Sequence, residues 1–170
     1  MVGCGAAPFA PSSVGLRFEP RESESARYVH RDSGVGFVMP AAADEGLREE
    51  DDAGFERVVV HAIDDGVEYR VVIFRPIDGT EVDPASAIAR LADGLVAGQT
   101  ALRDQTTSVD DHPARRLALT QATSGGGEVA FLVTADARAL VMMELVAPAG
   151  RGTAALADPF FASLELGCDR

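Results

Sequence analysis

The sequence contains no lysine, no asparagine and no tryptophan, and all 15 of its basic residues are arginines. The absence of lysine excludes Schiff-base catalysis through a lysine and excludes the lysine of a phosphate-binding P-loop. The absence of asparagine excludes Asn-linked glycans. Lysine and asparagine share A-rich codons, so their joint absence indicates a GC-rich genome.

Positive charge is also scarce, because the chain has a net charge of −12 at pH 7 and a pI of about 4.5. A protein that binds nucleic acid needs a basic face, so a nucleic-acid partner is excluded. An anionic membrane surface would repel the chain as well. A salt-adapted proteome is an alternative explanation of the acidity. The 170 residues, 46% of them hydrophobic, are enough for one globular domain with its own core.

Cysteine is limited to Cys4 and Cys168, near the two ends of the chain. The run Met1–Gly5 is typical of the end of a bacterial lipoprotein signal peptide, although the charged and long apolar parts of such a signal are missing. We therefore expect a lipid on Cys4 and an extracytoplasmic, membrane-anchored lipoprotein of the bacterial cell envelope. A Cys4–Cys168 disulfide, or two incidental cysteines, are the alternatives. Structural zinc needs four ligands, so these two cysteines alone do not predict a zinc site.

The chain divides into a polar N-terminal segment and a patterned remainder. Residues 1–33 are predicted to be a tether, because they combine proline, serine and a charge-dense stretch without apolar periodicity. Residues 34–168 are predicted to form a single domain. Residues 41–54 look like an acidic loop, and calcium binding there is the alternative, although the spacing of ligands in an EF-hand loop is absent.

The apolar pattern predicts strands joined mainly by hairpins, together with two helices. Asp64-Asp65-Gly66 is a strong hairpin signal between two alternating runs. Asp83-Pro84 and Asp158-Pro159 each predict the start of a helix, because aspartate favours the N-cap position and proline the first helical position. The predicted order is a strand at 35–39, strands at 55–63 and 67–77, a helix at 83–98, strands at 102–109, 114–122, 128–134 and 138–147, and a closing helix. This order predicts an α+β fold, with a central, mainly antiparallel sheet of about six or seven strands flanked by helices.

The order and spacing of these pieces resemble a known family. The run from Ser33 to Pro40, the paired strands with Tyr69, the His112-Pro113 turn and the closing Phe160-to-Leu164 segment are similar to small bacterial envelope proteins with the PsbP-like α/β/α fold. The resemblance implies an α/β/α sandwich over most of the chain. Many such proteins are lipoproteins, and relatives with this fold act mainly by binding proteins. No catalytic motif comes with the resemblance.

The three histidines are the first candidates for chemistry. His30 lies in the predicted tether, where no fixed geometry is expected. His61 lies in a strand and is expected to be a packed or edge residue. His112 follows Asp110 and Asp111, which could orient it as a general base. A turn before a proline also favours these residue types, so a structural role explains them equally. None of the histidines is therefore assigned a catalytic role.

The remaining motifs also have simple structural explanations. Gly34-Val35-Gly36 and Gly125–Gly127 lack the strand–loop–helix setting of a phosphate cradle, and no serine lies in a nucleophile elbow. Met142-Met143 has no neighbouring histidine or cysteine and is expected to be core. Arg115 and Arg116 are adjacent in a strand, so they point to opposite faces and cannot form one anion clamp. The prediction is no catalytic, cofactor-binding or metal-binding residue, with lipidation at Cys4.

The function predicted from the sequence is that of a non-catalytic, lipid-anchored envelope protein that binds another protein. The expected membrane contact is through the lipid on Cys4 alone, and no cofactor is expected. One alternative is a small-ligand or metal-binding envelope protein, which a deep apolar pocket would favour. Another alternative is an enzyme, which His112 beside an acidic residue in a cleft would favour. Protein binding predicts a shallow exposed patch instead.

Overall fold

The computed structural model describes residues 16–20, 25–50, 54–120 and 127–168. The elements are β1 (Leu16–Pro20), β2 (Ala26–His30), β3 (Val35–Met39), β4 (Asp44–Glu50), β5 (Phe55–Asp64), β6 (Val67–Pro76), α1 (Pro84–Val96), β7 (Ala101–Val109), β8 (His112–Thr120), β9 (Glu128–Ala135), β10 (Leu140–Ala147) and α2 (Thr153–Phe161).

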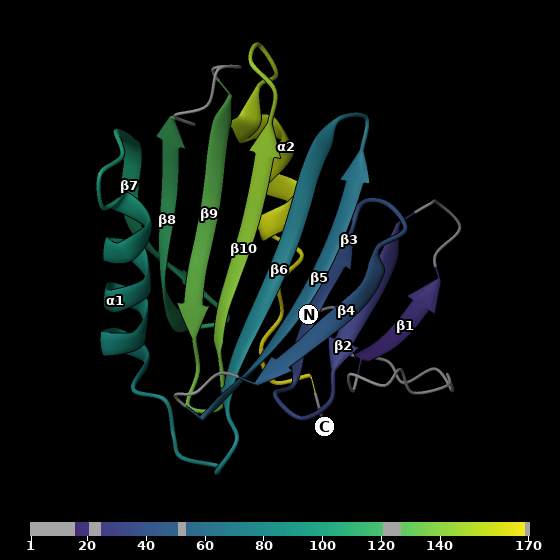
Figure 1. Cartoon of the computed structure of the whole chain (residues 1–170), viewed down its shortest axis with the longest axis vertical. Helices are drawn as coiled ribbons and strands as arrows, with labels where there is room; N and C mark the ends of the chain where they lie inside the picture. Colours follow the sequence, from purple (N-terminus) through teal and green to yellow (C-terminus); the bar gives the residue numbers. More distant parts are fainter. Residues whose placement is uncertain (1–15, 21–24, 51–53, 121–126, 169–170) are drawn as a thin grey trace.

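The strands form two sheets. The central sheet has seven strands in the order β4-β5-β6-β10-β9-β8-β7, and every neighbouring pair is antiparallel. The smaller sheet has the order β1-β2-β3. Helix α1 covers one face of the central sheet, and α2 lies on the other face together with the small sheet (Figure 1). The predicted α+β sandwich with a central antiparallel sheet is confirmed.

Two tight turns fix the register of neighbouring strands. Asp65 and Gly66 join β5 to β6 with φ values of +46° and +77°, and Asp110 and Asp111 join β7 to β8 with φ values of +47° and +67°. Two successive residues in the left-handed region are typical of a type I′ turn, whose twist matches that of a hairpin. The first turn lies at the predicted hairpin signal. The second is two residues shorter than predicted, because His112 and Pro113 belong to β8.

The core has two layers, one on each face of the central sheet. The larger layer lies between the sheet, α2 and the small sheet, and it contains Phe37, Val60, Val71, Met143 and Phe160. The second layer lies under α1, where Ile88 and Ala92 pack on β8, β9 and β10. Among the described residues, neither helix has the length and apolar character needed to span a bilayer.

The folded part begins earlier than predicted. Residues 1–33 were expected to be a tether, yet Ala26–His30 forms β2 with all five residues buried. The polar side chains of this strand have partners: Arg27 pairs with Glu165 at 2.5 Å, and the Nδ1 atom of His30 lies 2.8 Å from the Ser33 hydroxyl. Apolar periodicity does not reveal a strand whose buried polar groups are satisfied elsewhere in the fold.

Two further boundaries differ from the prediction. The expected acidic loop at 41–54 contains the edge strand β4, whose backbone pairs with β5 on one side, and backbone pairing does not require apolar side chains. Helix α2 begins at Thr153, so Pro159 lies inside it rather than at its start. Ala157, Phe160 and Phe161 are buried against the sheet, and this packing stabilises the helix despite the proline.

Candidate functional site

Helix α1 covers only part of its face of the central sheet. It contacts β8, β9 and β10, while the α1 side of β5 and β6 lies beside the helix rather than under it (Figure 1). We call the α1 side of β5 and β6 the open half of the sheet. It displays Ile63, which is 60% exposed, and half-buried Val59 and Phe74.

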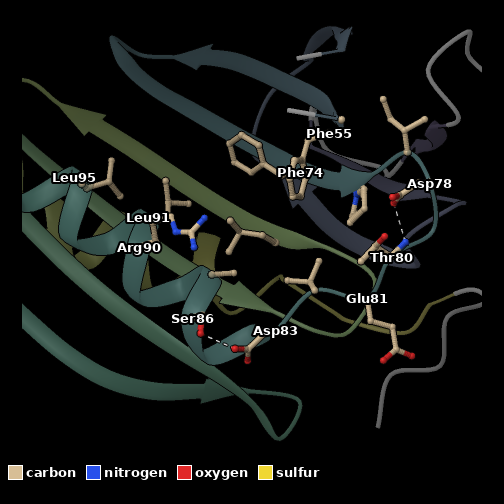
Figure 2. Close-up of a pocket in the computed structure, with 17 residues that line it drawn as sticks. Phe55, Phe74, Asp78, Thr80, Glu81, Asp83, Ser86, Arg90, Leu91 and Leu95 are labelled. Carbon is tan, nitrogen blue, oxygen red and sulfur yellow. Dashed lines mark hydrogen bonds between the residues drawn. The ribbon is translucent and has the colours of Figure 1, made fainter. Parts of the chain in front are cut away.

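A groove of about 950 Å³ lies between α1 and the open half of the sheet (Figure 2). One wall is α1, the other comes from the ends of β5, β6 and β10, and the connection from β6 to α1 closes one end. The floor of the groove consists of half-buried apolar side chains that come from both walls, namely Phe55, Phe74, Leu91, Leu95 and Leu140.

The spacing of residues along α1 explains why it forms a wall. Ile88 and Ala92 are four residues apart and face the sheet, whereas Leu91 and Leu95 form a second row on the flank of the helix. Gly94 lies beside that row, and a Cβ atom added there would meet nothing within 4 Å. A glycine in mid-helix costs about 0.5–1 kcal/mol relative to alanine, and here it keeps the wall of the groove open.

The rim of the groove is polar. Asp78 accepts a hydrogen bond from the Thr80 amide at 2.9 Å, and the hydrogen bonds from Thr80 hold the pKa of Asp78 below its ordinary value. Asp83 precedes α1 and accepts a hydrogen bond from the Ser86 hydroxyl at 2.5 Å. Arg90 lies one to two turns further along α1 and also lines the groove (Figure 2). The rim therefore offers carboxylates at one end and a guanidinium further along.

A second polar feature crosses the open half of the sheet. His61, Arg70 and Glu144 are directly opposite one another on β5, β6 and β10. Arg70 donates to Glu144 at 2.8 Å, while the Nε2 atom of His61 lies 3.9 Å from the Glu68 carboxylate. Burial raises the pKa of Glu144, and Arg70 opposes that shift. This row is an ion pair with a neighbouring histidine, and no nucleophilic side chain belongs to it.

The three histidines of the chain lie in three different strands. His30, expected in a tether, is buried in β2, so that expectation is wrong. His61 is half-buried on β5, and His112 opens β8 opposite Val109. Asp110 accepts a hydrogen bond from the Leu166 amide at 3.0 Å, so its carboxylate ties the C-terminal segment to the β7–β8 turn.

Arg115 and Arg116 point to opposite faces, as predicted. Arg115 pairs with Asp93 of α1 at 2.6 Å and with Asp104 of β7 at 2.7 Å. Arg116 pairs with Asp158 of α2 and lies over the Phe161 ring at 5.2 Å from its centroid. These contacts show that each arginine joins a helix to the sheet.

The cysteine predictions stay open. Cys4, the predicted lipidation site, lies outside the described residues. The sulfur of Cys168 is buried, 3.2 Å from a Glu165 carboxylate oxygen and 3.7 Å from the Arg27 guanidinium. These contacts bring the C-terminal segment against the small sheet, where the Glu165 and Gly36 backbones also pair.

The other motifs also have defined places or lie outside the description. Met143 is buried in the larger core layer and Met142 packs under α1, as expected for core residues. Gly36 lies against the C-terminal segment, where an added Cβ would lie 2.9 Å from the Cys168 sulfur. Gly125 and Gly126 lie outside the described residues. Among the described histidines, cysteines and carboxylates, no group of three or more is arranged to hold a metal ion.

Sequence reasoning missed the groove, although it placed several of its residues. Helical spacing groups Leu91 and Leu95 with Ile88 and Ala92 on one apolar face, and Arg90 falls off that face. Two signals in the sequence point toward a groove: a glycine within an amphipathic helix, and the carboxylates clustered before that helix at Asp78, Glu81 and Asp83. Neither signal indicates that β5 and β6 lie beside α1.

No protein-family model matches the chain, and no curated protein matches it either. Among solved structures, it is similar to the solution structure of cyanobacterial PsbP (CyanoP) from Synechocystis sp. PCC 6803, with a TM-score of 0.56 and 15% sequence identity. The match covers 96% of this chain and 99% of that chain. At this identity the similarity establishes the fold and nothing finer. The chain therefore has the PsbP-like fold that the order of its elements predicts.

Proposed function

We propose that this chain is a non-catalytic binding module of the bacterial cell envelope, held at the membrane by a lipid on Cys4, and that it binds another protein through the groove beside α1. The observation that carries the proposal is the groove itself, which combines an apolar floor with charged groups at its rim. Apolar side chains left half-covered between a helix and a sheet mark surfaces that a partner covers.

The chemistry of the groove fits binding better than catalysis. Its lining contains hydroxyls, carboxylates and one arginine, whereas the described histidines lie on strands outside it. Ile77, the residue after β6, lines the groove and is 47% exposed, so the apolar surface of the groove extends outward. An apolar strip that continues to the outer surface suits a partner larger than the groove itself.

A second candidate function is the binding of a small apolar ligand. The volume of about 950 Å³ supports it, because ligand pockets typically measure roughly 300–1,000 Å³ and are lined mainly by apolar side chains. Native mass spectrometry of the chain purified from its own cells distinguishes the two functions. A bound small molecule that is lost when Leu91→Asp is introduced would favour this candidate.

Site-specific photo-crosslinking in intact cells tests the protein-binding proposal. A benzoyl-phenylalanine replaces Ile77 at the groove, and a matched control places it at Leu102, which is 54% exposed on the edge strand β7. We expect a protein adduct from position 77 that is absent from position 102. Identical adducts from both positions, or none from position 77, would contradict protein binding at the groove.

The anchor has its own test. Mass spectrometry of the N-terminal peptide from membrane fractions should show a lipid on Cys4, and Cys4→Ala should release the chain into the soluble extracytoplasmic fraction. An unmodified Cys4 in the wild-type chain would refute the anchor and leave the groove proposal untouched.

A further inference from the structure

The charged groups at the groove are not neutralised by described residues. Asp78, Glu81 and Asp83 are exposed at the closed end of the groove, and Arg90 is exposed on its helical wall. None of the four takes part in an ion pair among the described residues. The groove therefore has an acidic end and a basic wall, both available to a bound molecule.

Several arginines elsewhere in the described part of the chain differ in this respect, whereas Arg103 of β7, like Arg90, forms no ion pair there. Arg115 of β8 lies between two aspartates, and Arg116 pairs with Asp158 on the opposite face. Arg151 pairs with Asp65 at the β5–β6 turn. These arginines neutralise nearby carboxylates within the fold, whereas the charges at the groove remain for a partner to match.

The spacing of these charges defines what fits. Asp83 and Arg90 are seven residues apart, which corresponds to about 10 Å along α1. The apolar floor, with Phe74, Leu91 and Leu95, runs beside this interval. A helix lying along the groove would meet both charges with side chains that are also seven residues apart, and apolar residues between them would face the floor.

We propose that the groove binds an amphipathic helical segment of a protein partner, with a basic residue opposite the Asp78–Asp83 end and an acidic residue about two turns away opposite Arg90. This inference rests on the proposed function and names the chemistry of its partner. Charge complementarity at the two ends fixes direction and register, while burial of apolar side chains supplies affinity.

The same charges disfavour an apolar anion as the occupant. A fatty-acid-like molecule would be attracted by Arg90, but the carboxylates of Asp78, Glu81 and Asp83 would repel it from the closed end. A segment that carries both signs of charge has no such conflict. An apolar anion is therefore kept as a separate outcome of the test.

The experiment selects binders from a phage library of random peptides of about 16 residues, roughly four helical turns. The bait is the full chain. Selected peptides are synthesised and titrated against the wild type, Gly94→Phe and Arg90→Glu. Gly94→Phe fills the groove from a position where a Cβ meets nothing within 4 Å, and thermal unfolding verifies that the variant folds. Leu102→Phe on β7 is the matched control for an added aromatic ring.

We expect apolar peptides with opposite charges about seven residues apart, whose affinity falls at least about tenfold in Gly94→Phe and is unchanged in Leu102→Phe. Replacing the acidic residue of the peptide by arginine should restore binding to Arg90→Glu. The inference is overturned if no peptide is selected, if the peptides bind Gly94→Phe as they bind the wild type, or if Arg90→Glu has no effect.

The experiments distinguish failure of the helical-partner inference from failure of the proposed protein-binding function. Crosslinking from position 77 could capture a protein while the selected peptides bind Arg90→Glu as tightly as the wild type. In that case the groove binds protein, and the inference of a helix with two opposite charges is wrong. If anilinonaphthalene sulfonate, an apolar anion, binds the wild type and is lost in both Gly94→Phe and Arg90→Glu while no peptide is selected, the small-ligand function replaces both.

Discussion

Glu56 and Arg75 face each other across β5 and β6, and the Arg75 guanidinium lies 2.5 Å from the Glu56 carboxylate. The two partners are covered unequally, because the side chain of Glu56 is 2% exposed and that of Arg75 is 25% exposed. Asp32 approaches the same arginine at 3.4 Å. The pair therefore consists of a buried carboxylate and a cation that reaches water.

This difference in burial predicts that removing each partner lowers the free energy of unfolding by a different amount. Arg75→Met removes a cation that pairs with this buried carboxylate and should lower the free energy of unfolding by about 2–3 kcal/mol. Glu56→Met leaves an arginine that reaches solvent and Asp32, so the loss should be smaller. Urea denaturation of both variants and of the double variant measures the difference. Equal losses in the single variants would contradict the argument from burial.

Gly94 and Gly98 make a matched pair within and just beyond α1. Gly94 is helical with open space where a Cβ would go, whereas Gly98 has φ +75°, a conformation that L side chains rarely adopt. Gly94→Ala should raise the free energy of unfolding by about 0.5–1 kcal/mol. Gly98→Ala should lower it by about 1 kcal/mol.

Thermal and urea denaturation of the two alanine variants check these signs. The same substitution is made at both positions, so a change in side-chain size cannot explain opposite results. A loss of stability in Gly94→Ala would show that the wall of the groove is filled and would also remove the basis for using Gly94→Phe as a blocking variant.

The sequence predicts well those features that depend on a few adjacent residues. The turn at Asp65-Gly66 needs positive φ values that aspartate and glycine tolerate, and α1 begins at Pro84 because proline fits a first helical turn. Hairpins joined by such turns also lead to the antiparallel sheet. These features could be predicted because the physics that sets them is local.

Features set by distant partners could not be predicted in the same way. The burial of Arg27 in β2 depends on Glu165, which lies 138 positions away in the chain. The groove depends on where β5 and β6 lie relative to α1. The apolar periodicity of a single strand does not determine the order of strands across a sheet. Leu91 packs against the core under α1 and also lines the groove, and helical spacing indicates only the first of these two contacts.

Glu144 predicts an unusual dependence of stability on pH. Burial raises its pKa above the ordinary value of 4.5, with Arg70 opposing the shift, so the folded chain binds this proton more tightly than the unfolded chain does. The free energy of unfolding should fall as the pH rises from 4.5 through the folded-state pKa. Glu144→Gln cannot ionise, so it should gain stability relative to the wild type over that window.

Urea denaturation of both chains at several pH values from about 4 to about 7 measures this effect. Arg70→Met is the informative control, because removing the opposing cation should raise the pKa of Glu144 further and widen the window. A stability difference between Glu144→Gln and the wild type that stays constant with pH would rule out the assigned cause.

The contacts of Arg115 predict that it stabilises the edge strand β7 against local opening. It donates to both carboxylate oxygens of Asp104, at 2.8 and 2.7 Å, and to Asp93 of α1 at 2.6 Å. The first eight residues of β7 are exposed, so few apolar contacts hold the strand beside its backbone pairing with β8. Arg115→Lys keeps the charge but loses the planar fork that reaches both aspartates.

Amide hydrogen exchange followed by mass spectrometry tests this role. In Arg115→Lys, the amides of β7 should exchange about three- to fivefold faster, corresponding to a loss of about 0.5–1 kcal/mol, while those of β9 and β10 should not change. Arg103→Lys, in the same strand, is the matched control, because Arg103 forms no ion pair among the described residues. Faster exchange throughout the sheet would mean that Arg115 supports the whole fold rather than its edge.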